Sequence, residues 1–270
     1  RYIDRIEKLS LLKKEEKRDI KIVYTPLHGT GLIPVTSILT KLGYYRIFLV
    51  NSQIRPDGNF PTVKAPNPED KEAFKEAIKL AKEKEADIIL ATDPDCDRVG
   101  VAVMDRAGNY ILLNGNQIGA LLCKYLLSHE GNINEKTAII KTIVTSDLGE
   151  RIAESFGASV FNTLTGFNFI GEKIMEFEQS NRYKFLFGYE ESYGYLAGAI
   201  VRDKDAVIAS MLIIEMAQSY KNKGLNLLEA IEELYKEYGY YLDYLETYTL
   251  EGVEGGLKIT KVVEEFRRIN

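Results

Sequence analysis

The chain has few of the features that secreted, membrane-spanning or nucleic-acid-binding proteins need. Its 270 residues include only two cysteines, Cys96 and Cys123, so we expect free thiols, a reducing compartment and a cytoplasmic location. No apolar run approaches the roughly 18 residues of a membrane-spanning helix. Lysine and arginine number 35 against 40 acidic residues, which leaves no basic excess to neutralise nucleic-acid phosphates. We therefore expect neither a membrane nor a nucleic acid as partner.

The composition that is present is typical of a folded α/β protein. Apolar residues make up 45% of the chain and charged residues 28%, a balance that permits a large core without disulfides. The length allows one large domain or two ordinary ones. The chain begins with Arg1 and not with methionine, and it ends abruptly after a predicted helix. We expect it to be a fragment of a longer chain.

Strand-like and helix-like segments alternate along the first part of the sequence. Four of the seven prolines fall within 51–70, which excludes a regular helix or central strand there and predicts a long, functional loop. Around this loop the patterns predict helices over 1–18, 32–42 and 71–85, and strands over 19–24, 46–50, 87–91 and 99–104.

The same alternation returns in the second part. The predicted helices are 116–127, 147–156, 169–177, 205–220 and 225–238, and the predicted strands are 138–144, 159–161 and 185–187. This rhythm indicates the α/β class, with two consecutive layered α/β domains whose mixed sheets are flanked by helices. We place the domains at 1–114 and 115–239, followed by a connecting segment at 240–270, in which the tyrosine-rich part to 250 reads as a strand or linker.

Three carboxylates alternate directly after an apolar strand. Asp93, Asp95 and Asp97 repel one another unless a cation compensates them, and oxygen ligands of this kind suit Mg²⁺. Arg98 follows at once, and a guanidinium can hold a phosphate through paired hydrogen bonds. The pattern favours phosphoryl chemistry at the end of this strand. A solvated acidic turn is the alternative.

Weaker candidates lie elsewhere in the chain. In an extended chain Glu190 and Ser192 point to one side, where a carboxylate and a hydroxyl can bind neighbouring sugar hydroxyls. Arg202 and Lys204 precede a long helix, and Lys204 could donate a proton or contact phosphate. His28, in a glycine-containing loop, could touch phosphate. Each candidate has a plainer alternative. The loop of Glu190 and Ser192 could be an ordinary acidic turn, the segment of Arg202 and Lys204 a solvated helix start, and His28 a structural histidine.

Five segments together resemble the α-D-phosphohexomutase family of phosphoglucomutases and phosphomannomutases. Their order and spacing match, and they cover most of the chain. The segments are TPLHGTG at 25–31, DPDCDR at 93–98, TGF at 165–167, GYEESYGY at 188–195 and RDKD at 202–205.

The resemblance implies an enzyme that interconverts hexose 1-phosphate and hexose 6-phosphate through a phosphoserine and a bisphosphate. The family has four domains, and this chain would supply the second, metal-binding one (1–114) and the third, sugar-binding one (115–239). The segment 240–270 would lead toward a missing fourth domain. No Thr-x-Ser-His-Asn-Pro or Ser-Gly-Thr segment is present, so the first and fourth domains would be partners from the same longer chain. We expect the fragment alone to be inactive.

The resemblance also assigns roles to single residues. Mg²⁺ would be held by Asp93, Asp95 and Asp97, and Arg98 would contact the phosphate in transit. The hexose phosphate would be bound by Glu190 and Ser192. Lys204 would be an acid–base or phosphate group, and Arg202 and His28 are further candidates for substrate contact. At Asn168 many relatives would have a lysine, which puts a charge role at this position in doubt.

Two other functions are compatible with the sequence. In a Mg²⁺-dependent phosphatase an aspartate after an apolar strand is the nucleophile, so Asp93 would be phosphorylated. Alternatively, the chain could be a non-catalytic module that binds sugar phosphates. A base-labile acyl phosphate on Asp93 would indicate the phosphatase.

Overall fold

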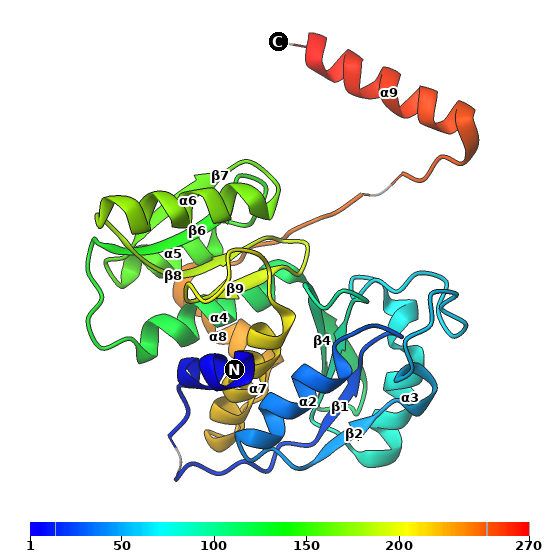
Figure 1. Cartoon of the computed structure of the whole chain (residues 1–270), viewed down its shortest axis with the longest axis vertical. Coiled ribbons are helices and arrows are strands. Elements are labelled where there is room, and N and C mark those ends of the chain that lie inside the picture. Colours follow the sequence, from blue (N-terminus) through cyan, green and yellow to red (C-terminus); the bar gives the residue numbers. More distant parts are fainter. Residues whose placement is uncertain (14, 247, 270) are drawn as a thin grey trace.

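The computed structural model describes residues 1–13, 15–246 and 248–269, which form two α/β units and an outlying helix (Figure 1). One unit is built on a five-stranded sheet and the other on a four-stranded sheet. Both sheets mix parallel and antiparallel pairs, and helices pack on them. The predicted fold class, two consecutive layered α/β domains with mixed sheets, is confirmed.

The first sheet has the strand order β2-β1-β3-β4-β5. Strands β1 to β3 run parallel, whereas β4 and β5 are antiparallel additions. Alternate residues of each strand enter different cores, as the two-residue period of a strand requires. Val23 and Ile89 face a core shared with α3, and Tyr24 and Leu90 face the core on the other side. The strands are Ile22–Thr25, Ile47–Leu49, Ile88–Thr92, Val99–Met104 and Tyr110–Leu113 for β1 to β5.

Three helices and three short 3-10 turns of the described residues belong to this unit. Those after β1 connect the strands and place the long proline-containing loop between β2 and α3. These elements are α2 (Leu32–Lys41), η2 (Asn51–Gln53), η3 (Lys71–Phe74) and α3 (Lys75–Lys84), with η1 (Glu7–Leu9) after the N-terminal α1 (Tyr2–Ile6).

The second sheet has the strand order β7-β6-β8-β9, with only β9 antiparallel to its neighbour. A full capping box, in which Asn114 and Gln117 exchange side-chain and backbone hydrogen bonds, begins α4. The strands are Thr137–Thr142, Ser159–Thr163, Lys184–Tyr189 and Tyr195–Ala197 for β6 to β9, and the helices are α4 (Gly115–His129), α5 (Leu148–Ser155), α6 (Phe167–Ser180) and α8 (Leu227–Tyr238).

Helix α7 (Ala206–Asn222) joins the two units, although it follows the second sheet in sequence. It contacts α2 and β4 of the first unit as well as β9 and α4 of the second. Its Gln218 side-chain oxygen accepts hydrogen bonds from the backbone N–H groups of Asp19 and Ile20, both at 2.9 Å. Most of its residues are buried. One hydrophobic core therefore runs through both units.

The structure differs from the sequence prediction at the N-terminus and in two short strands, and it decides between the two alternatives left for the segment after Gly239. The predicted helix over 1–18 is wrong beyond Leu9, because Leu11 and Leu12 join the hydrophobic core instead, and the Leu11 N–H donates to Glu215 of α7 at 2.9 Å; Lys14 lies outside the described residues. The short strands β5 and β9 were not predicted. Beyond Gly239, residues 240–246 and 248–250 form neither helix nor strand, and α9 (Gly252–Arg268) projects away from both sheets (Figure 1). Thr247 and Asn270 are not among the described residues.

None of the described helices combines the length and apolar character that crossing a membrane requires.

Candidate active site

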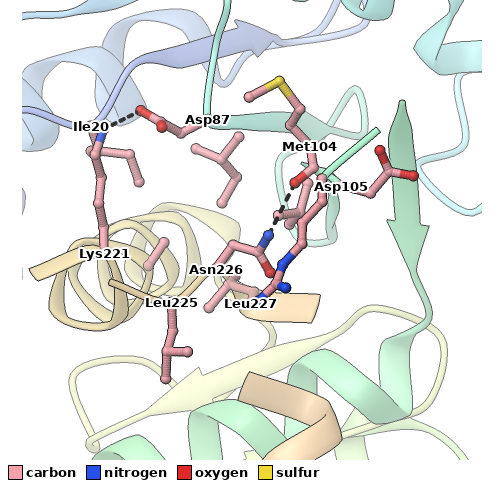
Figure 2. Close-up of a pocket in the computed structure, with 12 residues that line it drawn as sticks. Ile20, Asp87, Met104, Asp105, Lys221, Leu225, Asn226 and Leu227 are labelled. Carbon is pink, nitrogen blue, oxygen red and sulfur yellow. Dashed lines mark hydrogen bonds and ion pairs between the residues drawn. The ribbon is translucent and has the colours of Figure 1, made fainter. Parts of the chain in front are cut away.

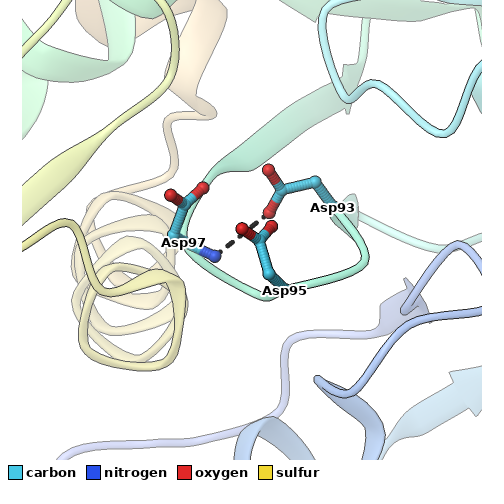
Figure 3. A group of neighbouring side chains, drawn as sticks. All are labelled: Asp93, Asp95 and Asp97. Carbon is cyan, nitrogen blue, oxygen red and sulfur yellow. Dashed lines mark hydrogen bonds between the residues drawn. The ribbon is translucent and has the colours of Figure 1, made fainter. Parts of the chain in front are cut away.

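The alternating aspartates lie in the turn between β3 and β4. The turn closes on itself through the Cys96 N–H, which donates to the Asp93 carbonyl at 3.0 Å, and Cys96 adopts a left-handed backbone with φ of 61°. One carboxylate oxygen from each of Asp93, Asp95 and Asp97 lies within 4.8 Å of the others (Figure 3). The structure thus brings together all three predicted metal ligands.

The three carboxylates differ in exposure. Asp93 is only 1% exposed, and burial raises its pKa to about 6 even though hydrogen bonds from Arg98 oppose the shift. Asp95 is exposed and Asp97 is half-buried. A set of three clustered carboxylates with an open side fits a hard divalent cation such as Mg²⁺, which prefers oxygen ligands and keeps some water.

Arg98 donates hydrogen bonds to two acidic side chains beside this group, and its Nε also lies 3.7 Å from Asp97 Oδ1. Its Nε donates to Asp93 Oδ2 at 2.7 Å, and its Nη1 donates to Glu69 Oε1 at 3.2 Å. Arg98 was predicted from the sequence, whereas Glu69, which lies at the end of the proline-containing loop, was not. No local pattern marks Glu69, because its contact with Arg98 depends on the path of that loop.

The predicted sugar-binding residues follow β8. Glu190 is 7% exposed, and its Oε1 accepts a hydrogen bond from the Gly166 N–H at 2.8 Å. Burial raises the pKa of Glu190, against the opposing effects of this bond and of Lys204. Ser192 is half-buried on the same loop. Glu191 accepts hydrogen bonds from other partners, the hydroxyls of Thr142 and Thr145.

The aspartate turn and the loop after β8 are in direct contact. Arg98 and Gly194 form an antiparallel bridge, and the Val99 N–H donates to the Tyr193 carbonyl at 3.2 Å. The Lys204 ammonium lies 2.9 Å from Asp97 Oδ2. Burial tends to lower the pKa of Lys204, but the contacts with Asp97 and other acidic groups outweigh it and raise the pKa. Lys204 therefore connects the two predicted sites as a cation.

Two further candidates have their side chains engaged elsewhere. The His28 ring is buried, with Nδ1 3.2 Å from the Arg55 carbonyl and Nε2 2.8 Å from Thr62 Oγ1. Arg202 forms an ion pair with Glu178 on α6. Neither contact brings these side chains to Glu190, and a role in substrate binding stays a prediction for both.

A separate pocket lies at the opposite end of the first sheet (Figure 2). It is bordered by Asp87, which precedes β3, and by Met104 at the end of β4. Two pairs of its polar groups bond to each other: Lys221 Nζ lies 2.6 Å from Asp87 Oδ2, and Asn226 Nδ2 donates to the Met104 carbonyl at 3.2 Å. The pocket is therefore distinct from the aspartate turn.

Comparison with known families agrees with this arrangement. Residues 1–108 match the model of phosphoglucomutase/phosphomannomutase alpha/beta/alpha domain II, and residues 114–238 match that of domain III. The chain belongs to the phosphoglucomutase/phosphomannomutase family, of which it contains these two domains. Asn114, near which the sequence predicted the domain boundary, caps α4, and the exact boundary stays a prediction.

Individual relatives extend the comparison. The chain is 41% identical over 267 residues to a phosphoglucomutase of Staphylococcus haemolyticus, covering 99% of this chain and 48% of the relative. It is 40% identical over 251 residues to a phosphoglucomutase of Staphylococcus aureus, covering 93% of this chain and 45% of the relative. The chain thus spans about half the length of the curated relatives it matches.

Solved structures share the fold. A putative phosphomannomutase from Thermus thermophilus superimposes with a TM-score of 0.73 at 21% identity, over 88% of this chain and 50% of that one. The N-acetylphosphoglucosamine mutase of Aspergillus fumigatus, in complex with GlcNAc-6P and magnesium, superimposes with a TM-score of 0.55 at 16% identity. This match covers 87% of this chain and 51% of that one.

Proposed function

We propose that the chain carries the cation-binding and sugar-binding parts of a phosphoglucomutase/phosphomannomutase. The complete enzyme would interconvert hexose 1-phosphate and hexose 6-phosphate through a phosphoserine and a bisphosphate intermediate. The observation that supports this most is the junction of the two loops, where Lys204 pairs with Asp97 at 2.9 Å and Arg98 bridges to Gly194. A phosphoryl group and the sugar that receives it need to meet at one such place.

The residues of this junction suit distinct tasks. We propose that Asp93, Asp95 and Asp97 hold Mg²⁺, which when bound would offset the negative charge on the transferring phosphoryl group. Arg98 uses Nε and Nη1 for its bonds to Asp93 and Glu69. In the described part of the chain this leaves Nη2 to donate to a phosphoryl oxygen, since a guanidinium has five donors.

On the sugar side, the Gly166 N–H fixes one oxygen of Glu190. The other oxygen can accept from a sugar hydroxyl, and Ser192 follows on the same loop. Lys204 lies between this loop and Asp97, and can deliver a proton to the departing oxygen or balance the phosphate charge. The serine that carries the phosphoryl group is absent from this sequence, so another part of a longer chain would supply it.

The geometry disfavours Asp93 as a nucleophile. Its Oδ1 accepts from the N–H groups of Asp97 and Arg98 at 3.1 and 2.9 Å, and its Oδ2 accepts from Arg98 Nε. Oδ1 has both acceptor positions filled and Oδ2 keeps one, which is enough for a small cation, whereas the almost complete burial of the side chain keeps a phosphate from approaching it. The same contacts suit a ligand that is held in one orientation.

The test uses the longer native protein in a coupled assay of glucose 1-phosphate conversion to glucose 6-phosphate with Mg²⁺. Asp95→Asn removes the negative charge of the exposed carboxylate among the three proposed cation ligands. We expect activity to fall at least about tenfold. Asp243→Asn, an exposed aspartate in the segment after α8, is the matched control and should retain activity. Wild-type activity in Asp95→Asn would refute the cation role. An inactive wild type with an acyl phosphate on Asp93 would establish the phosphatase instead.

A further inference from the structure

The proline-containing loop 51–70 is fastened at its start by a chain of hydrogen bonds that is buried at Thr25 and Gln53 and reaches the surface at Thr62. The Thr25 hydroxyl donates to Gln53 Oε1 at 2.6 Å, and Gln53 Nε2 donates to Thr62 Oγ1 at 3.0 Å. Because His28 Nδ1 faces the Arg55 carbonyl, this nitrogen carries the proton, and Nε2 accepts from the Thr62 hydroxyl. Each donor in the chain has one acceptor. His28 thus helps to fix the path of the loop.

The end of the loop is fastened equally closely, next to Arg98. A Cβ on Gly100 would lie 2.4 Å from the Pro68 carbonyl oxygen, so only glycine allows the loop to approach β4 at this point. The Asn67 side chain accepts from the Glu69 N–H at 3.0 Å. Proline at 66 and 68 restricts the backbone on both sides of Asn67. The backbone of Glu69 is therefore held in place before its side chain meets Arg98.

The two acidic anchors of Arg98 differ in one respect. Asp93 is a proposed cation ligand, so an ion bound there competes with Arg98 for the Asp93 oxygen that now accepts from Nε. Glu69 belongs to no such group, and its contact with Nη1 does not depend on the cation. The side chains of Arg98 and Glu69 are only 30% and 27% exposed, so water screens this charge-assisted bond less than it would an exposed pair.

We propose that Glu69 is a positioning residue, which keeps the Arg98 guanidinium directed at the phosphoryl group when Asp93 binds the cation. The loop 51–70 then acts as a rigid support for Glu69. The proposal rests on the proposed mutase function, because the phosphoryl group in question is that of the reaction. Glu69 itself touches neither substrate nor cation.

The first test compares Glu69→Gln with Glu72→Gln in the longer native protein. Glu72 lies three residues along the chain, is exposed and pairs with Lys75, so it controls for the loss of one negative charge. In Glu69→Gln we expect kcat to fall about 10- to 100-fold, with KM and the melting temperature close to those of the control. Equal kcat in the two variants would overturn the proposal.

A double-mutant cycle tests whether Glu69 acts through Arg98. In an Arg98→Ala background, Glu69→Gln should lower kcat no further, since no guanidinium is left to position. A full additional loss in that background would show that Glu69 acts by another route. If wild-type protein fails to turn over hexose phosphates, the proposed function fails with it.

A second readout does not depend on turnover. The Nη1–H resonances of Arg98, assigned by their loss in Arg98→Lys, are followed by NMR in the longer protein during titration with Mg²⁺. In wild type Nη1 keeps its bond to Glu69, so this proton should stay protected from exchange with water, and in Glu69→Gln the added Mg²⁺ should expose it. The same response in both proteins would contradict the proposal, whether the proton stays protected or becomes exposed.

Discussion

Gly115, the first residue of α4, provides a steric test of the sugar-binding loop that leaves its chemical groups intact. A Cβ at this position would lie 1.9 Å from the carbonyl oxygen of Glu191 and 3.0 Å from the Tyr193 nitrogen. Both atoms are backbone, so no side chain can turn aside to make room. In Gly115→Ala the loop that carries Glu190 and Ser192 must therefore move.

The size of the effect follows from this overlap. Ordinary contact begins at 3.4 Å, so the loop or the helix must shift by roughly 1 Å or more. Overpacking of this kind costs about 1–3 kcal/mol of stability, and a 1 Å misplacement of groups that hold the substrate can lower the rate about 100-fold. We expect kcat/KM to fall by about that factor, while the aspartate turn continues to bind cations.

The assay is the coupled conversion of glucose 1-phosphate by the longer protein, together with thermal unfolding. Gly131→Ala is the matched control, because a Cβ there meets nothing within 4 Å and the backbone angle is ordinary. If Gly115→Ala matched Gly131→Ala in both kcat/KM and melting temperature, the loop would not be held against α4, and the reasoning would be refuted.

Two further predictions concern the charged groups Lys204 and Glu215. Lys204→Met should lower the free energy of unfolding by about 1 kcal/mol, because it removes a half-buried ion pair with Asp97; urea unfolding that is unchanged from wild type would contradict this. Burial raises the pKa of Glu215 above its ordinary 4.5, against hydrogen bonds from Ser10 and the Leu11 N–H. The folded state therefore binds this proton more tightly than the unfolded state, so the contribution of Glu215 to stability is greatest below pH 4.5 and is lost as the pH rises through the raised value. Urea unfolding across this range should show a weaker decline with pH in Glu215→Gln than in wild type.

Local patterns predicted the fold where neighbouring residues determine it. The strands β1 and β3 are short apolar runs, and the aspartate turn directly follows the second of them, so both could be identified from the sequence. The segment 10–18 could not, because its leucines are held by tertiary contact with α7 and not by helical spacing. Strands β5 and β9 are only four and three residues long, and pairing with a neighbour defines them more than their composition does.

The candidate site shows the same division. Residues within one loop, such as Asp93, Asp95 and Asp97, were found together because their spacing carries the signal. The contact of Lys204 with Asp97 joins loops far apart in the chain. The resemblance gave each residue a role but did not predict that the two would form an ion pair. No sequence pattern marked Glu69 as part of the site, because its contact with Arg98 depends on the path of the twenty-residue loop 51–70.

The position of α7 bears on how the protein is made. The ribosome completes the strands of the first sheet well before it synthesises Ala206–Asn222, yet this helix supplies part of the first sheet's covering core. Domains commonly fold in turn as they emerge during synthesis. Here α7 cannot complete the core that contains Tyr24 and Leu90 until the second sheet has also emerged from the ribosome. We therefore expect the two units to acquire their native packing together.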